Sequence, residues 1–238
     1  MRIALIGYGK MGKTIEAMGI RQGYSFPLII DLNNSGDLNP DKIKGIDAAI
    51  EFSAPEAAPG NILRCMELGL PVVSGTTGWN DRLEEVKKAC KESGGALFYA
   101  SNFSIGVNIL FAMNRKLAGI MDSFPQYRVS MEEIHHVHKL DAPSGTAITL
   151  AEGIIGELKT CNSWSLEKHD NPAEIHINAI RRDEVKGIHE VIYDSPIDSL
   201  SIRHEAKTRD AFASGVLLAA AYIKERKGYF GMSDLLNI

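Results

Sequence analysis

The chain has 238 residues with 26 basic and 30 acidic side chains, a formal net charge of −4 and a pI near 6.0. This balance excludes a general attraction for nucleic acid or for an anionic membrane surface. Its 45% hydrophobic and 24% charged residues are ordinary globular usage, which excludes disordered and fibrous classes, and the length suits one large domain or two modest ones.

The cysteines and the apolar runs indicate in which cellular compartment the protein is expected. Cys65, Cys90 and Cys161 are odd in number and follow no spacing pattern, which fits reduced thiols better than a disulfide framework. The longest apolar run, 215–223, is too short to span a membrane, and no signal peptide precedes the first strand. We therefore expect a cytoplasmic protein with a small-molecule substrate and neither a nucleic-acid nor a membrane partner.

The chain opens with an apolar strand, 2–6, that leads into a glycine-rich turn and a helix over 14–22. In a dinucleotide fingerprint the first glycine makes the turn, the second lets the backbone meet the pyrophosphate, and the third lets the helix pack closely on the strand. A glycine turn in a nucleotide-free α/β domain is the alternative. The predicted cofactor contacts here are Gly7, Tyr8, Gly9, Lys10, Met11 and Gly12.

An acidic residue ends the second predicted strand, 27–30. Asp31 stands 24 positions after Gly7, near the spacing of an acid that binds the adenosine ribose hydroxyls. The next residue is Leu32, which is not a cation. Because Asp31 would repel a 2′-phosphate, we expect NADH to be well accepted, with NADPH as the second cofactor.

Strands and helices alternate up to about residue 105, with further strands near 48–52, 71–74 and 96–100. This alternation predicts a Rossmann-type, doubly wound parallel sheet, which binds its ligand beyond the carboxyl ends of the strands. The turn 75–78 is equally compatible with a plain tight turn. The expected contacts near the nicotinamide are Gly75, Thr76, Thr77, Ala100, Ser101, Asn102 and Phe103, with Asn102 on the carboxamide.

The pattern changes after a helical stretch at 107–121. Strands then follow one another at 126–134, 174–181, 188–193 and 199–204, interrupted by one helix from Ser144. Consecutive strands predict a second, α+β domain with a mixed sheet. The helix 209–227 would return to the first domain. We expect a dinucleotide-binding domain of residues 1–105 with 209–238, and a substrate-binding and oligomerisation domain of residues 106–208.

The densest chemistry lies at 132–147, which holds three acids, three histidines, a lysine and a Pro-Ser-Gly-Thr turn. Histidine exchanges a proton near neutral pH, and lysine supplies a cation and a proton. In a straight strand His135 and Lys139 would stand about 13 Å apart, so the chain must curl for both to reach one small substrate.

The turn Ser144, Gly145 and Thr146 opens an apolar-periodic helix. The free N–H groups of a first helical turn favour an anion, and Gly145 would let a carboxylate approach. These parts suit an anionic substrate that must be protonated. A metal site at the histidines is the alternative, but Lys139 would repel a cation, and we expect no metal. A structural role is favoured first for His138.

With both regions in view, the chain resembles the dihydrodipicolinate reductases from end to end. The shared motifs are the glycine turn, 75–78, 102–108, 135–147 and 206–215. The resemblance implies reduction of hydroxy-tetrahydrodipicolinate to tetrahydrodipicolinate with NADH or NADPH in lysine and diaminopimelate synthesis, by a homotetramer joined through second-domain sheets. It implies that His135 is the acid/base residue and Lys139 the proton donor. It also implies that His136, Gly145 and Thr146 bind substrate carboxylates.

Two features depart from the family, and two other classes of protein remain. The glycine turn is one residue shorter than the commonest form, and Ala54 stands where many relatives carry an arginine. A semialdehyde dehydrogenase would need a reactive cysteine, and no cysteine lies near a motif. A non-catalytic nucleotide sensor would have a decayed second site, whereas His135, Lys139 and the 144–146 turn are all present.

Overall fold

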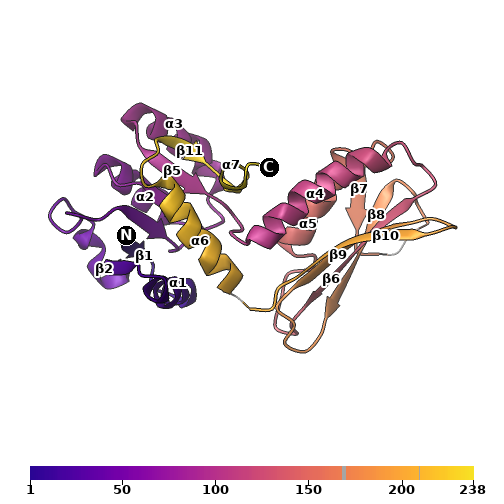
Figure 1. Ribbon diagram of the computed structural model, residues 1–238, viewed down its shortest axis with the longest axis horizontal. Helices are drawn as coiled ribbons and strands as arrows, with labels where there is room; N and C mark the ends of the chain where they lie inside the picture. The colour runs from indigo at the N-terminus through magenta and orange to yellow at the C-terminus, as the bar shows by residue number, and fades with distance from the viewer. Residues whose placement is uncertain (168–169, 209) are drawn as a thin grey trace. The chain divides into compact units, whose positions relative to one another are not determined.

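The structure, a computed structural model, describes residues 1–167, 170–208 and 210–238. It divides into two compact units (Figure 1). The first joins Met1–Ile105 to Asp210–Ile238, and the second is the intervening chain from Gly106. Arg209, where the last long helix was predicted to begin, lies outside the described residues. Among those that are described, none of the helices combines the length and apolar character that crossing a membrane requires.

The first unit is built on a six-stranded sheet whose neighbouring strands are all parallel. The strand order reverses between β1 and β3, which makes the carboxyl ends of these two strands the expected ligand position. The doubly wound parallel sheet is therefore confirmed. In spatial order the strands are β11 (Gly228–Phe230), β5 (Ala96–Tyr99), β4 (Val72–Ser74), β3 (Ala48–Glu51), β1 (Arg2–Ile6) and β2 (Ser25–Ile30).

Helices cover both faces of this sheet. Ile3 and Leu5 of β1 join one buried cluster with residues of α1 (Lys10–Arg21) and α6 (Asp210–Ile223). Ala4 and Ile6 join another with α2 (Ala58–Glu67) and α3 (Leu83–Ser93). Because both faces are buried, β1 is a continuous apolar run rather than an alternating one. Short helical turns at Leu32–Asp37 and Asn80–Arg82, and α7 (Met232–Leu236), complete the unit.

The second unit is a five-stranded mixed sheet, which confirms the predicted type. Strand β6 runs antiparallel to β9 and parallel to β8. In spatial order the strands are β10 (Ser199–Glu205), β9 (Ile188–Asp194), β6 (Arg128–His135), β8 (Glu174–Arg181) and β7 (Ser163–Ser165). Helices α4 (Ile105–Met121) and α5 (Gly145–Ile155) lie against this sheet (Figure 1). They share one buried core with it, to which Leu110 of α4, Leu150 of α5 and Met131 of β6 belong.

Several elements differ from the sequence prediction. Helix α1 begins at Lys10 instead of residue 14, because the glycine turn feeds directly into the helix with Gly9 as its N-cap. The prediction missed β7, β11 and α7, which have three, three and five residues. Elements this short carry too few residues for a hydrophobic period to appear.

Candidate active site

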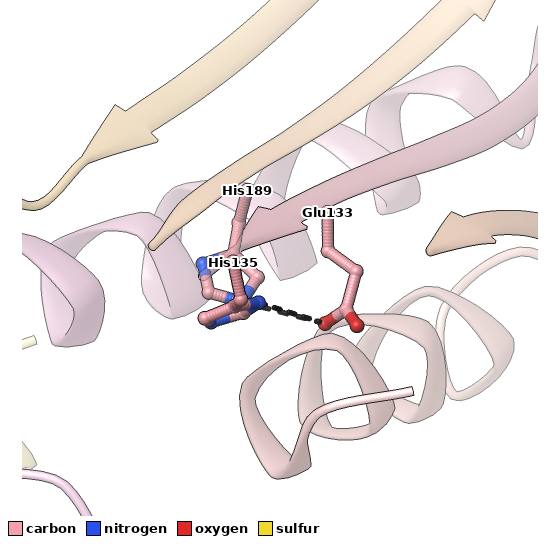
Figure 2. Close-up of side chains that lie close together, drawn as sticks. All are labelled: Glu133, His135 and His189. Atoms are coloured by element: carbon pink, nitrogen blue, oxygen red, sulfur yellow. Dashed lines mark ion pairs between the residues drawn. The ribbon is translucent and has the colours of Figure 1, made fainter. Parts of the chain in front are cut away.

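A polar cluster continues the buried face of the second sheet. Alternate residues of a strand point to one face, so Met131, Glu133 and His135 of β6 all turn toward the helices. Across the sheet Glu133 pairs with His189 of β9, and His135 pairs with Arg181 of β8. The face is apolar at Met131 and becomes polar toward the carboxyl end of β6. Glu133, His135 and His189 converge there (Figure 2).

The Glu133 carboxylate lies at the centre and is fully buried. Its Oε1 accepts a hydrogen bond from Arg181 Nη2 at 3.1 Å, and its Oε2 accepts one from the Ser144 N–H at 3.0 Å. His135 Nδ1 and His189 Nε2 each lie 3.8 Å from Oε2. Burial alone would raise the pKa of this carboxyl. The bonds from Ser144, the His135 imidazole and the Arg181 bond reverse that effect and hold the pKa below its usual value.

Burial disfavours the charged form of both imidazoles. Their ring centroids lie 5.1 Å apart in an edge-on arrangement. Burial lowers the pKa of both rings, with Glu133 opposing, and takes the pKa of His189 to about 3. Within the described part of the chain, Nδ1 of each ring has no hydrogen-bond partner. A neutral His135 can accept a proton, and an anion bound beside it would raise its pKa again.

Ser144 ties this cluster to the first turn of α5. Its hydroxyl caps the helix by accepting from the Ala147 N–H at 3.2 Å, and it lies 3.1 Å from His189 Nε2. Ser144 is therefore buried and engaged within the protein. Gly145 is exposed, and a Cβ built on it would meet nothing within 4 Å. With half-buried Thr146 beside it, the helix N-terminus has open space in which an anion could lie.

The chain turns back sharply after β6. Lys139 donates from its backbone N–H to the His136 carbonyl at 3.1 Å, and its ammonium group holds both oxygens of Asp141 at 2.8 Å. Arg181 fastens this loop to β8 by donating to the carbonyls of Lys139 and Asp141. Lys139 is close enough for its charge to contribute to the lowered pKa of His135. The curl that a joint role for these two residues requires is therefore present.

The other two histidines have different surroundings. His136 is half-buried, and its Nδ1 has no hydrogen-bond partner among the described residues. His138 is exposed and lies 3.5 Å from a Glu184 carboxylate oxygen. This surface ion pair fits a role outside the chemistry for His138.

The cluster offers enough ligand atoms to raise the question of a metal ion. One ligand atom each from Glu133, His135 and His189 lies within 4.8 Å of the others. However, Glu133 already accepts from Ser144 and from the guanidinium of Arg181, so its oxygens are committed. The nearby positive charges of Arg181 and Lys139 also oppose a cation. These contacts favour a proton-exchanging cluster over a metal centre.

In the first unit, the glycine turn has the close contacts that a dinucleotide fingerprint needs. Gly7 has a φ of +92°, and a Cβ there would lie 2.1 Å from the Phe52 carbonyl oxygen. A Cβ on Gly12 would lie 2.4 Å from the Gly7 oxygen, whereas one on Gly9 would meet nothing within 4 Å. The first and third glycines are thus required by packing, and the second leaves open space for a phosphate group. These residues fit a bound dinucleotide.

The remaining predicted cofactor residues lie at or beyond the carboxyl ends of β2, β4 and β5. Asp31 is exposed and caps the turn Leu32–Asp37 by accepting from the Leu32 N–H at 2.9 Å. Asn102 accepts from the Ser104 N–H at 2.9 Å. The Phe103 ring is buried against Phe98, 5.8 Å between centroids, so its side chain belongs to the core.

Three members of the second-unit cluster are absent from the sequence prediction: Glu133, Arg181 and His189. Each has the same strand parity as buried apolar neighbours, such as Met131 for Glu133 and Val191 for His189. A polar residue at an inward position of a strand is the signal that could have found them.

Neutral His189 makes the stability of the protein depend on pH. Its pKa of about 3 lies below the unfolded value of 6.5, so between these limits the unfolded chain binds a proton that the folded protein does not. This contribution to stability is complete above the unfolded pKa and is lost as the pH falls. Between about pH 6.5 and 5, the free energy of unfolding of the wild-type protein should therefore fall by about 2 kcal/mol more than that of His189→Gln. Urea unfolding measures it, and identical pH dependence in both proteins would contradict it.

Comparisons with known proteins agree with this geometry. Family models match in both halves: "Dihydrodipicolinate reductase, N-terminus" over residues 1–103 and "Dihydrodipicolinate reductase, C-terminus" over residues 106–236. A 4-hydroxy-tetrahydrodipicolinate reductase of Christiangramia forsetii is 47% identical over 239 residues, covering 100% of this chain and 98% of the relative. The corresponding protein of Neisseria gonorrhoeae is 31% identical over 230 residues, covering 94% and 84%.

A solved structure supports the fold. The dipicolinate-bound dihydrodipicolinate reductase of Paenisporosarcina sp. TG-14 matches with a TM-score of 0.77 at 22% identity, covering 97% of each chain. Each half of the chain matches its own model of the same family, and a relative from that family is 47% identical over the full length. The chain belongs to the dihydrodipicolinate reductase family.

Proposed function

We propose that this protein reduces 4-hydroxy-tetrahydrodipicolinate to tetrahydrodipicolinate with NADH or NADPH, in the synthesis of lysine and diaminopimelate. The observation that carries the proposal is the buried cluster of Glu133, His135 and His189 beside Lys139 and the open N-terminus of α5. This combination offers exchangeable protons and an anion position to one small dicarboxylate. Family membership and the names of the full-length relatives support it.

The first unit is proposed to hold the cofactor, which supplies a hydride when bound. The turn from Gly7 to Gly12 would hold the pyrophosphate at the start of α1, and Asp31 the adenosine ribose. The contacts proposed near the nicotinamide are Gly75, Thr76, Thr77, Ala100, Ser101, Asn102 and Phe103. Tyr8, Lys10 and Met11 complete the proposed set.

The second unit is proposed to bind and protonate the substrate. Gly145 and Thr146 would receive one carboxylate at the N-terminus of α5, with Ser144 shaping the turn through its cap and His136 adding a donor. The negative charge of the substrate would raise the pKa of His135, so that this ring holds a proton in the complex. Glu133 would stabilise the imidazolium. Lys139 or His135 then delivers the proton after loss of water.

Asp31 gives a prediction about cofactor choice. We expect Asp31→Ala to weaken NADH binding by about 10- to 100-fold, because a hydrogen bond to a charged group is worth about 1.5–3 kcal/mol. NADPH should be affected less, since its 2′-phosphate cannot use the same contact. Dissociation constants for both cofactors measure this, with Asp41→Ala, an exposed acid paired with Lys44 at 2.8 Å, as the control. Equal weakening of NADH and NADPH would remove Asp31 from the ribose site.

We also propose a homotetramer joined through the sheets of the second unit, and a cytoplasmic location in which the free, buried cysteines stay reduced. Light scattering should then give a mass about four times the 26.0 kDa of one chain.

The function is tested by growth. A bacterial strain that lacks its own reductase requires supplied diaminopimelate, and the wild-type chain should relieve that requirement. The His135→Gln variant, produced at the same level as the wild-type protein, should not relieve the requirement. A wild-type protein that accumulates in folded form and leaves the requirement in place would contradict the proposed function.

A further inference from the structure

A second buried carboxylate, in the first unit, has no role in the mechanism above. Glu51 is the last residue of β3, and its side chain is 0% exposed. It stands at the switch point of the sheet, where β1 and β3 end beside each other. A carboxyl group completely removed from water must be hydrogen-bonded, because leaving its oxygens unpaired is strongly unfavourable. Its partners therefore show what this residue holds in place.

All of its side-chain partners come from the ends of two neighbouring strands. Oε1 accepts from the Ser53 N–H at 2.9 Å, from the Ser53 hydroxyl at 2.5 Å and from the Thr76 hydroxyl at 2.9 Å. Oε2 accepts from the Ser74 hydroxyl at 2.6 Å. The Gly75 N–H adds a bond to the Glu51 carbonyl at 3.0 Å. The Glu51 side chain thus links the segment that follows β3 to the segment that follows β4.

These bonds fix the direction of Thr76. Its hydroxyl points inward to Glu51, and its carbonyl accepts from the Trp79 indole at 2.6 Å. Thr76 is buried and Thr77 is exposed, so Thr77 is the threonine of this loop that is open to solvent. Gly75 packs against Phe52 so closely that a Cβ would lie 2.1 Å from the ring. The loop after β4 therefore has little freedom of its own while Glu51 holds it.

We propose that Glu51 is a positioning residue for the cofactor site, holding the segments after β3 and β4 in the conformation that receives the nicotinamide half of the dinucleotide. The inference rests on the proposed function, since it needs a dinucleotide to bind here. Glu51 itself would not touch the dinucleotide. It acts through Ser53, Thr76 and the backbone at Gly75.

Two substitutions of Glu51 distinguish the effect of its hydrogen bonds from the effect of its side-chain volume. Glu51→Ala removes every hydrogen bond of the Glu51 side chain and takes their buried acceptor from the Ser74 and Thr76 hydroxyls, while the Ser53 N–H keeps a second acceptor in Thr76 Oγ1 at 2.9 Å. In Glu51→Gln the amide oxygen can still accept from Ser53 and Thr76, while the amide NH₂ donates to the Ser74 hydroxyl, which can accept. Gln should therefore restore most of what Ala removes.

The experiment measures NADH dissociation constants by fluorescence titration, together with thermal midpoints and amide hydrogen exchange. We expect Glu51→Ala to weaken NADH binding at least tenfold and to speed exchange at 52–54 and 75–79, and Glu51→Gln to stay within a few-fold of wild type. Val86→Ala, a buried truncation in α3, is the control: it should lower the midpoint and leave NADH affinity unchanged.

Three outcomes decide the matter. Folded Glu51→Ala with wild-type NADH affinity would overturn the inference alone, because its role would then be structural. Wild-type protein that binds neither NADH nor NADPH would overturn the proposed function as well. If Glu51→Ala fails to fold, Ser74→Ala is the second variant, because it removes one hydrogen-bond donor to Glu51 at a fully buried residue. A two- to tenfold weakening of NADH binding by Ser74→Ala would support the inference, and unchanged NADH affinity would refute it.

Discussion

Replacing His135 by glutamine is expected to lower turnover by about 10²–10⁴-fold, the usual contribution of a general acid or base. Glutamine keeps a polar side chain of similar size but cannot exchange a proton near neutral pH. His135 is 8% exposed and sits beside the ionised Glu133, where a proton held by the ring would be stabilised. Steady-state kcat at saturating substrate measures the effect, and NADH affinity should remain unchanged.

A matched control lies three residues away. His138 is exposed, lies 3.5 Å from a Glu184 carboxylate oxygen, and is not one of the three buried residues Glu133, His135 and His189. His138→Gln should therefore keep turnover within about twofold of wild type, as expected for a surface substitution. If His135→Gln also turned over at the wild-type rate, His135 would lose its assignment as the acid/base residue.

Lys139→Met should lower turnover by a similar factor, about 10²–10⁴-fold. Methionine keeps the length and apolar stem of lysine but removes the ammonium group and its proton. Asp141 loses its partner, yet its side chain is 59% exposed and can be solvated, so unfolding should not explain the loss. Because the Lys139 charge helps to lower the pKa of His135, the variant should also raise that pKa. The pH profile of kcat/KM would show the shift.

Lys159→Met is the corresponding control. Lys159 also pairs with an aspartate, Asp122, at 2.9 Å, but its side chain is 88% exposed and distant in sequence from the cluster. Its loss should leave kcat unchanged, because isolated surface ion pairs contribute little. Wild-type turnover in both Lys139→Met and His135→Gln would mean that the proton comes from another group.

The overall fold was predictable because the sequence of a strand reflects which of its faces are buried. A strand such as Ile3–Ile6 is apolar on both faces, and only a sheet covered by helices on both sides buries such a run. The second-domain strands instead follow one another along the chain, and this order predicted a second domain with a mixed sheet. The three-residue strands β7 and β11 gave no comparable signal.

The polar clusters were harder to predict, because they depend on register and side-chain direction. Glu133 meets His189 and Arg181 only because three strands align at particular residues, and no local pattern specifies that alignment. The His135 and Lys139 positions were predicted because one short segment carries both. Likewise the sequence did not indicate that Thr76 turns its hydroxyl inward to Glu51, where the expectation placed it toward the nicotinamide.

The most direct test of the central claim is NADH oxidation by the purified protein, followed by its near-ultraviolet absorbance. The preceding synthase would form the substrate in place from pyruvate and aspartate semialdehyde, and the assay would be repeated with NADPH. We expect rapid oxidation that requires both the synthase and this protein, with NADH well accepted. Folded protein that binds NADH but oxidises neither cofactor when the substrate is present would contradict the proposed reductase.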